Sequence, residues 1–368
     1  MSSMLYLVAR ITRKMGINKY VFNILKVCVG RDQEHLAMDG WMHSLSQISP
    51  DKGVSCIRQI PFLRRGARVD LDIIIPVYNT EKYVAECIES ALNQKSRYLF
   101  RVIIIDDGST DASPDIINSY VNDSRVHIIH QENRGFSGAR NRALEQIEGR
   151  YVTFLDSDDR LPVDSIEKLL SKAYEGDFDI VGGGYVRFEG KRYRSKAIPH
   201  VDLLYGLVCG KVYKAQIWEK IKFPENYWFE DTINALIVHD SAKKITSIQN
   251  IVYEYRINRK SISFRSIGNP RVIDSLWVTL RLVKDRETLG LPLDNKFLDQ
   301  LVNQCKVNMI RIASLGNRQA NKANFYASVE LYNRYCKNYR CRKSANTQLE
   351  DAILHNDYWQ FLLGCLFL

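Results

Sequence analysis

Short apolar runs alternate with helical patterns across residues 71–155, and this alternation limits the fold more than any other feature. The first run, 71–77, is almost continuously apolar, as expected of a strand that is buried on both faces. Short connections between alternating strands and helices predict a parallel, doubly wound α/β sheet with helices on both faces. The predicted strands are 71–77, 100–105, 125–129 and 151–155, and the predicted helices are 81–93, 111–121 and 137–147.

The alternation continues through a helix at 164–174 and a strand at 178–181, and mixed strands follow across 185–255. From residue 270 onward apolar residues recur at helical spacing, which predicts a mainly helical region. We therefore expect three regions: a partly helical appendage at 1–65, an α/β domain at 66–265 with halves at 66–160 and 161–265, and a helical region at 266–368.

A polar cluster follows each of the first four predicted strands. Ligands of doubly wound sheets bind beyond the carboxyl ends of the strands, and these ends meet at one edge. We therefore expect the four clusters to form one site. They are residues 76–79, 106–111, 133–141 and 156–159.

The fourth cluster holds three carboxylates, Asp156, Asp158 and Asp159. Adjacent carboxylates repel each other unless a cation offsets their charge. Hard oxygen ligands suit Mg²⁺ or Mn²⁺, which would bridge the protein to a diphosphate and neutralise it as it leaves. The alternative is an acidic loop that caps the helix beginning near Asp164. The position directly after the fourth strand favours the metal.

Side chains of the other clusters suit a nucleotide. Asp107 can accept a hydrogen bond from a ring N–H of a base such as uracil, although an Asx turn is an alternative. Tyr78 can stack on the base, or be a surface tyrosine. Gly135 and Ser137 open a helix whose first amides can face a phosphate, and Arg140 can reach the same place unless it forms a surface ion pair.

Two acids, Glu230 and Asp231, precede an apolar helical run at 233–238 within a helix predicted near 231–240. Acids at a helix N-terminus cap it and complement its dipole. The functional interpretation makes Asp231 a general base that deprotonates an acceptor hydroxyl.

The ordered set of motifs at the ends of the predicted strands resembles that of the inverting glycosyltransferases of family 2, which have the GT-A fold. The motifs are I-I-P-V-Y-N, D-D-G-S-T-D, N-x-G-x-S-x-A-R-N and L-D-S-D-D across residues 71–160. The likeness continues more loosely to Glu230-Asp231 and to Tyr255-Arg256-x-Asn258-x-x-Ser261. It implies a nucleotide-sugar half at 66–160 and an acceptor half at 161–265.

The resemblance also implies roles for individual residues. Asp158 would be the main metal ligand, with help from Asp156 or Asp159, and Asp231 would be the catalytic base, with Glu230 orienting it or the acceptor. The residues expected to bind the nucleotide-sugar are Pro76, Tyr78, Asn79, Asp107, Gly135, Arg140, Asp156, Ser157, Arg256 and Ser261. Among these, Arg256 and Ser261 would belong to a loop that closes over the diphosphate.

The function implied is transfer of a single sugar, with inversion, from a nucleotide-sugar such as a UDP-sugar to a hydroxyl of a glycan or lipid-linked glycan. A divalent metal, Mn²⁺ or Mg²⁺, would assist. The Q-x-x-R-W motif and the membrane spans of processive members are missing, so we expect short transfer in the biosynthesis of capsule, O-antigen or exopolysaccharide. A sugar-nucleotide-binding but inactive homologue and a nucleotidyltransferase remain alternatives.

Other classes fit less well. The glycine-rich fingerprints of dinucleotide-dependent oxidoreductases and of P-loop NTPases are missing. A net charge of +10 suits nucleic acid, but aspartates at the strand ends would repel its phosphates, so no nucleic-acid partner is expected. Eight scattered cysteines without a C-x-x-C pair indicate reduced thiols in the cytoplasm and disfavour zinc.

Both ends of the chain raise the question of a membrane. Leu5, Val8, Ile11 and Met15 recur at helical spacing with cations between them, which fits a helix packed on the main domain or one lying on an anionic membrane. A basic, tyrosine-rich stretch at 316–345 precedes an apolar end, which fits either peripheral attachment to an anionic leaflet or a C-terminal helix docked on the catalytic domain. No apolar run is long enough to span a bilayer.

Overall fold

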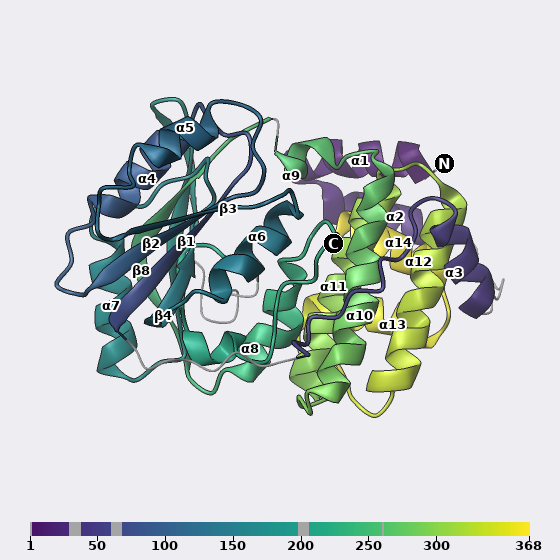
Figure 1. Ribbon diagram of the computed structural model, residues 1–368. Coiled ribbons are helices and arrows are strands. Elements are labelled where there is room, and N and C mark those ends of the chain that lie inside the picture. Colours follow the sequence, from purple (N-terminus) through teal and green to yellow (C-terminus); the bar gives the residue numbers. More distant parts are fainter. Residues whose placement is uncertain (1, 29–37, 60–67, 198–205, 260) are drawn as a thin grey trace. The chain divides into compact units, whose positions relative to one another are not determined.

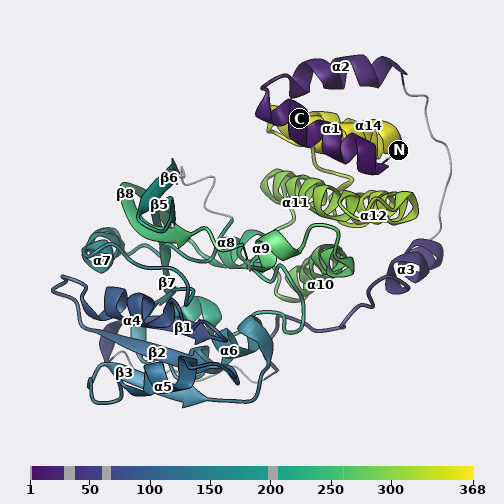
Figure 2. The same ribbon diagram turned by 90° about the horizontal axis from the view of Figure 1, so that it is seen from above.

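The computed structural model describes residues 2–28, 38–59, 68–197, 206–259 and 261–368 (Figures 1 and 2). The chain forms two compact units. The α/β unit comprises 54–226 and 233–259, and the helical unit comprises 1–53, 227–232 and 260–368. The predicted boundary between residues 65 and 66 lies outside the described residues.

An eight-stranded sheet forms the centre of the α/β unit, with the order β3-β2-β1-β4-β7-β5-β6, and β8 pairs with β5. The strands β3, β2, β1 and β4 are parallel, whereas β7 runs antiparallel to both of its neighbours. The sheet is thus mostly parallel, as predicted. Its strands are β1 (Val69–Val77), β2 (Phe100–Asp106), β3 (Val126–His130), β4 (Gly149–Phe154), β5 (Ile180–Glu189), β6 (Arg192–Ala197), β7 (Lys211–Lys214) and β8 (Ile245–Arg256).

Helices connect the parallel strands, and their positions confirm the alternation predicted from the sequence. Helix α6 contacts β1 and β2, and α7 packs along β5, β7 and β8. The helix predicted near 231–240 is present at 232–241, with a π-helical turn at 234–238 between short α-helical stretches. The helical elements are α4 (Val84–Leu92), α5 (Ser113–Asn118), α6 (Gly135–Leu144), α7 (Ser165–Glu175), η2 (Ala215–Trp218), η3 (Asn234–Val238) and α8 (His239–Ser241).

Strand β1 is buried on both faces, yet it carries a carboxylate at its centre. Asp72 is 0% exposed. Its Oδ2 accepts the backbone N–H groups of Glu148 and Gly149 at 2.6 Å each, and its Oδ1 accepts Nε of Arg101 at 2.9 Å. These bonds satisfy the buried charge and join the start of β4 to β1.

The helical unit is built from segments at both ends of the chain. Residues Leu301, Cys305, Met309 and Ile312 of α11 are buried, as the apolar periodicity predicts. The elements are α1 (Ser2–Lys14), α2 (Asn18–Cys28), α3 (Met38–Ser46), α9 (Ile262–Arg265), η4 (Pro270–Ile273), α10 (Asp274–Thr288), α11 (Asn295–Ala313), α12 (Arg318–Leu331), η5 (Tyr332–Cys336), α13 (Ser344–Leu354) and α14 (Tyr358–Phe367).

The apolar C-terminal segment is the buried helix α14, which contacts α1, α2, α11, α12 and α13. Asp357 caps it by accepting the N–H of Gln360 at 3.0 Å. This end of the chain is a docked helix, but the contacts named above lie within the helical unit and not on the catalytic domain. Among the described residues, no helix combines the length and the apolar character needed to cross a membrane.

Candidate active site

The candidate site lies at the carboxyl edge of the parallel strands. The chain runs outward from β1 to β2 and β3 and then returns to place β4 on the other side of β1. A crevice opens where the strand order reverses in such sheets, so the ends of β1 and β4 mark the expected ligand position. The polar clusters that follow β1, β2, β3 and β4 therefore meet at this edge.

The ends of β1 and β2 are joined by side-chain hydrogen bonds. Asn79 adopts a left-handed backbone (φ 51°), and its Oδ1 accepts the N–H of Thr110 at 2.8 Å, while its own N–H donates to Oγ of Ser109. Pro76 lies within β1 opposite Ile105. Tyr78 follows β1 with 49% of its surface exposed, so its ring is accessible to a ligand.

Asp107 presents a buried acceptor atom. The residue is 2% exposed, and its Oδ1 accepts Nε2 of Gln131 at 2.7 Å and the N–H of Arg134 at 2.9 Å. Its Oδ2 is buried and has no hydrogen-bond partner among the described residues. Burial raises the pKa of this carboxyl, although the hydrogen bonds oppose the shift. The turn itself uses Asp106, whose Oδ1 accepts the N–H of Ser109 at 3.0 Å, so the turn does not depend on Asp107.

The start of α6 faces this edge through its backbone. Gly135 has φ 73°, a conformation that favours glycine, and its N–H donates to Oδ1 of Asn133. Arg140 is not a surface residue: it is 5% exposed, and its Nη2 donates to Oδ1 of Asp156 at 2.8 Å. Its guanidinium lies 5.4 Å from the ring centre of Phe223. Arg140 therefore fixes the orientation of Asp156.

The acidic loop after β4 contains carboxylates in unlike surroundings. Asp159 is 2% exposed, and its two oxygens accept the Tyr253 hydroxyl at 2.7 Å and the N–H of Arg256 at 2.6 Å. Asp158 is more accessible, and its Oδ2 accepts Nδ2 of Asn258 at 2.8 Å. Burial raises the pKa of Asp158, and the nearby charge of Asp156 adds to this shift while Asn258 opposes it. Asp159 thus holds the loop to β8.

These carboxylates fit a divalent metal. Repulsion between Asp156 and Asp158 would be relieved by a cation, and carboxylate oxygens are ligands that Mg²⁺ and Mn²⁺ prefer. Within the part of the chain that the structure describes, no group of three or more His, Cys, Asp or Glu side chains forms a metal cage. Mg²⁺ is often held by one or two protein carboxylates together with substrate phosphates.

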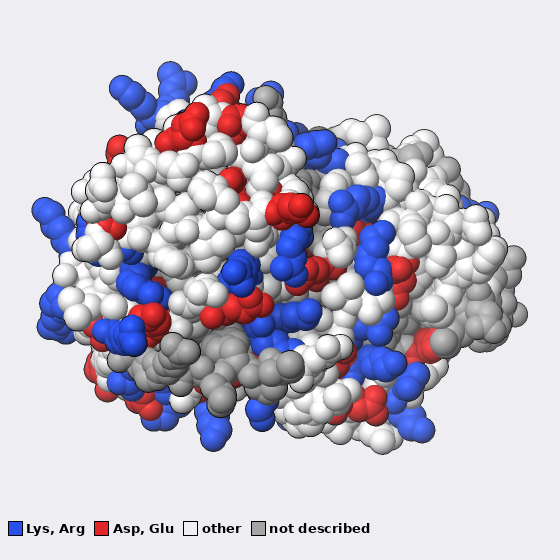
Figure 3. Space-filling view, in the orientation of Figure 1, with Lys and Arg blue, Asp and Glu red and all other residues white. Residues whose placement is uncertain are grey.

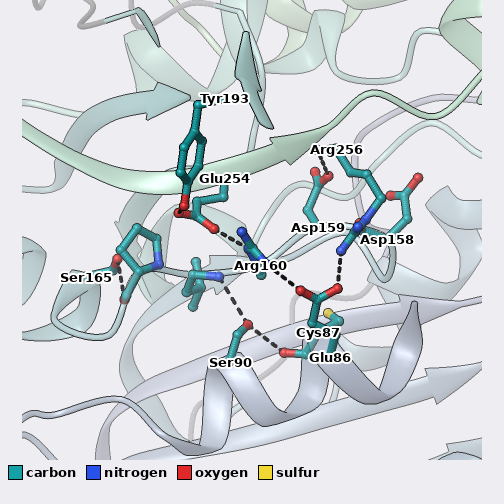
Figure 4. Close-up of polar contacts among 12 residues, drawn as sticks. Glu86, Cys87, Ser90, Asp158, Asp159, Arg160, Ser165, Tyr193, Glu254 and Arg256 are labelled. Carbon is teal, nitrogen blue, oxygen red and sulfur yellow. Dashed lines mark hydrogen bonds and ion pairs between the residues drawn. The ribbon is translucent and has the colours of Figure 1, made fainter. Parts of the chain in front are cut away.

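Two arginines, Arg160 and Arg256, brace the acidic loop against α4 (Figure 4). Glu86 of α4 accepts hydrogen bonds from both Arg160 and Arg256, and Arg160 also binds Glu254. Nε of Arg256 donates to the carbonyl oxygen of Asp158 at 2.6 Å. Burial acts to raise the pKa of Glu86, but the two arginines outweigh it and lower the pKa. Arg256 therefore contacts the backbone of the residue predicted to bind the metal.

The sequence did not reveal this brace. Glu86 occupies the first turn of α4, where an acid is ordinary, and no family motif includes it. Arg160 follows the acidic loop directly, but its partners lie more than 70 residues away in the sequence. No local pattern could have identified these contacts.

The segment 227–232, which carries Glu230 and Asp231, belongs to the helical unit. Tyr227 donates to Asp51, and the N–H of Trp228 donates to Oδ2 of buried Asp274 at 3.0 Å. Phe229 has a left-handed backbone (φ 64°), which is unusual for a bulky residue. A backbone held in this way is over-determined by its surroundings and often marks a functional site.

Arg311 of α11 lies beside this segment. Its guanidinium stands 3.8 Å from the ring centre of Phe229, and its Nη1 donates to Oγ of Ser275 at 2.7 Å. Burial lowers the pKa of Arg311, while the negative charges of Asp231 and Glu230 oppose that shift. Arg311 thus places a cation beside the two acids, a contact that has no sequence signal because Arg311 is remote in the chain.

Comparison with known proteins bears on this site. The family model described as "Glycosyl transferase family 2" matches residues 72–243. An uncharacterized glycosyltransferase of Haemophilus influenzae is 33% identical over 233 residues, which are 60% of this chain and 90% of that protein. The chain belongs to glycosyl transferase family 2. The match to glycosyltransferase GlyA of Streptococcus pneumoniae is 33% identical over 218 residues, 52% of this chain and 31% of GlyA.

A solved structure supports the GT-A fold of this family 2 chain. Staphylococcus aureus TarS 1–349, in complex with UDP-GlcNAc, superposes with a TM-score of 0.60 at 19% identity, covering 80% of this chain and 89% of TarS 1–349. The chain spans about a third of the length of GlyA, its first curated relative. What the whole protein binds and transfers is therefore argued from its site.

The predicted site residues divide between the two units. The helical unit holds Glu230, Asp231 and Ser261, and Ser261 directly precedes α9. Ser157 is 7% exposed, and its Oγ accepts the hydroxyl of Thr80 at 3.1 Å, so it ties the ends of β4 and β1 together. The remaining predicted residues lie in the α/β unit: Pro76, Tyr78, Asn79, Asp107, Gly135, Arg140, Asp156, Ser157, Asp158 and Arg256.

Proposed function

We propose that the chain transfers one sugar from a nucleotide-sugar, a UDP-sugar in the first instance, to a hydroxyl of a glycan or lipid-linked glycan, with inversion. The observation that carries the proposal is the buried Oδ2 of Asp107, which has no partner among the described residues and lies at the carboxyl edge of the sheet. A buried acceptor without a donor is costly, and the N–H of a uracil ring would satisfy it. The UDP-GlcNAc bound by TarS, which shares the fold, suggests the first probe.

The same proposal assigns a divalent metal, Mn²⁺ or Mg²⁺, to Asp158 and Asp156. When bound, the cation supplies charge neutralisation to the departing diphosphate. Arg140 orients Asp156 through its 2.8 Å bond, and Arg256 fixes the backbone of Asp158. These residues set the position of the two carboxylates before any ligand arrives, which reduces the cost of ordering them.

Asp231 is proposed as the general base that accepts the proton of the acceptor hydroxyl while the sugar transfers in one displacement. Arg311 supplies a nearby positive charge to Glu230 and Asp231, and a base in this role must lie within reach of the acceptor hydroxyl. Glu230 then orients Asp231 or the acceptor. An inactive homologue would bind donor without turnover, and a nucleotidyltransferase would instead consume a sugar phosphate and a nucleoside triphosphate.

A polysaccharide such as capsule, O-antigen or exopolysaccharide is the proposed product class, built on a lipid-linked acceptor. We place the reaction in the cytoplasm, at the inner face of the membrane. Peripheral contact with that leaflet would bring the site to such an acceptor without a membrane span. No nucleic-acid partner is proposed: Figure 3 shows Lys and Arg interspersed with Asp and Glu on the visible face.

The test is a binding screen by thermal unfolding. UDP-, GDP-, dTDP- and CDP-sugars are each added with Mn²⁺, Mg²⁺ or EDTA. A ligand present at 100 times its Kd adds about 2.7 kcal/mol to stability. We expect a metal-dependent rise with UDP-sugars that Asp107→Ala abolishes. No rise with any nucleotide-sugar, in a sample that unfolds cooperatively, would reject the proposed site.

A further inference from the structure

Large apolar side chains are exposed in one stripe along each of the two N-terminal helices. Spacings of three and four residues place each set on a single helix face. Stripes of this kind are uncommon on soluble surfaces and mark a binding surface. The stripe residues are Met4, Leu7 and Ile11 on α1 and Tyr20, Ile24 and Val27 on α2, with exposed fractions from 48% to 86%.

The opposite faces of the same helices are docked on the helical unit. Ala9 and Phe22 are buried, at 4% and 3% exposed. Nη2 of Arg13 donates to the carbonyl oxygen of Leu366 at 2.9 Å, and Nδ2 of Asn18 donates to that of Phe367 at 2.7 Å. Figure 2 shows α1 and α2 beside α14. The exposed stripes are therefore held in a fixed position by a packed structure.

The charge of the two helices has one sign. Residues 2–28 contain five cations and no acid. On α1, Arg10 and Lys14 are exposed beside the apolar stripe, and on α2, Lys19 and Lys26 are exposed in the same way. An apolar stripe flanked by cations on a short amphipathic helix complements the acyl region and the anionic headgroups of a lipid leaflet.

We propose that α1 and α2 form a membrane-binding surface for an anionic leaflet, with the stripes among the upper acyl chains and with Arg10, Lys14, Lys19 and Lys26 at the lipid phosphates. These two helices would make the leaflet contact of the proposed function. The proposal rests on that function only in assuming that the acceptor is lipid-linked. In this proposal the C-terminal helix α14 does not insert into the membrane. Its side chains are buried, and it packs against α1 and α2.

Vesicle flotation with the full chain tests the proposal. Vesicles of phosphatidylcholine alone are compared with vesicles containing 30 mol% phosphatidylglycerol. We expect binding only to the anionic vesicles, and weaker binding as salt is raised. The double variant Leu7→Glu, Ile24→Glu should lose binding, and neutralising Lys19 and Lys26 should weaken it about 5-fold per cation.

A matched control carries the same charge change elsewhere. Leu99 and Val121 of the α/β unit are 65% and 63% exposed, so Leu99→Glu, Val121→Glu should float like the parent chain. Equal flotation of the Leu7→Glu, Ile24→Glu variant and the parent, or no binding to anionic vesicles, would overturn the proposal. So would a stable dimer that this variant makes monomeric, because a second copy would then cover the surface. Donor binding, measured on the same variants without vesicles, reports separately on the proposed function.

Discussion

Neighbouring carboxylates of one loop differ in role because their surroundings differ. Asp159 is buried and both of its carboxylate oxygens accept hydrogen bonds from β8, whereas the carboxylate of Asp158 accepts one from Asn258. We predict that Asp159→Asn lowers the free energy of unfolding by about 1–3 kcal/mol, because an amide N–H₂ would face a donor. Asp158→Asn should change stability little and abolish the metal-dependent part of donor binding. Chemical denaturation and calorimetric titration with Mn²⁺ would measure both effects. Unchanged metal dependence in Asp158→Asn would remove it as a ligand.

Glu86 is a positioning residue, because it reaches the acidic loop only through Arg160 and Arg256. We predict that Glu86→Ala weakens metal-dependent donor binding about 10-fold, because two part-buried charge-assisted hydrogen bonds are lost and the backbone of Asp158 is released. Glu86→Gln should keep part of the effect. The control is Glu89→Ala, which removes an exposed acid from the same helix. Equal donor affinity in Glu86→Ala and Glu89→Ala would contradict the bracing role.

Asp231 provides a separate test of chemistry. Because it lies in the helical unit while the nucleotide residues lie in the α/β unit, its substitution should spare donor binding. We predict that Asp231→Asn keeps the donor Kd and lowers kcat by about 10²–10⁴-fold, the usual contribution of a general base. Single-turnover kinetics with a saturating acceptor would measure it. Normal turnover would exclude Asp231 as the base.

At the scale of elements, the junction of β1 and β4 leaves no room for a side chain at Gly149. A Cβ added to Gly149 would lie 2.6 Å from the carbonyl oxygen of Tyr151 and 2.7 Å from the N atom of Asp72, both backbone atoms of the central sheet. We predict that Gly149→Ala destabilises the protein by about 1–3 kcal/mol through overpacking. Gly206→Ala is the control, because an added Cβ there meets nothing within 4 Å. If the thermal melting curves of Gly149→Ala and Gly206→Ala coincided, this account would be refuted.

The elements that the sequence predicts are those that carry a local signal. The apolar run that becomes β1 is read from its composition, and the four polar clusters follow from the strand ends. Contacts made by remote partners have no such signal. Glu86 with Arg160 and Arg256, and Arg311 beside Asp231, each join residues that are far apart in the chain. The helix predicted near 231–240 is present, but the π-helical turn within it has no signal in the sequence.

At the scale of the whole molecule, the chain passes from one unit to the other four times. The six-residue segment 227–232 is the shortest stretch of chain assigned to either unit. The acids proposed for acceptor chemistry thus depend on the helical unit for their position. Asp107 and Asp158, which are proposed to bind the nucleotide and the metal, depend on the sheet for their position. Binding and transfer should therefore respond differently to damage in the two units.

Leu362, which is 0% exposed in α14, allows this separation to be tested. We predict that Leu362→Ala costs about 2–5 kcal/mol by leaving a cavity in the helical unit. Leu354→Ala, at a position 44% exposed near the end of α13, should be nearly neutral. We expect scanning calorimetry to show two unfolding transitions, with the helical unit unfolding at the lower temperature. In Leu362→Ala this lower transition should move to a lower temperature, while added donor should still stabilise the α/β unit.

Turnover of Leu362→Ala should then fall as temperature rises through that lower transition, because the helical unit no longer holds the segment of Asp231 against Arg311 and Asp274. Donor affinity should persist over the same range, since the buried acceptor of Asp107 and the brace of Glu86 lie in the other unit. Loss of both properties at one temperature would mean that the two units unfold as one, and the division of labour between them would have to be abandoned.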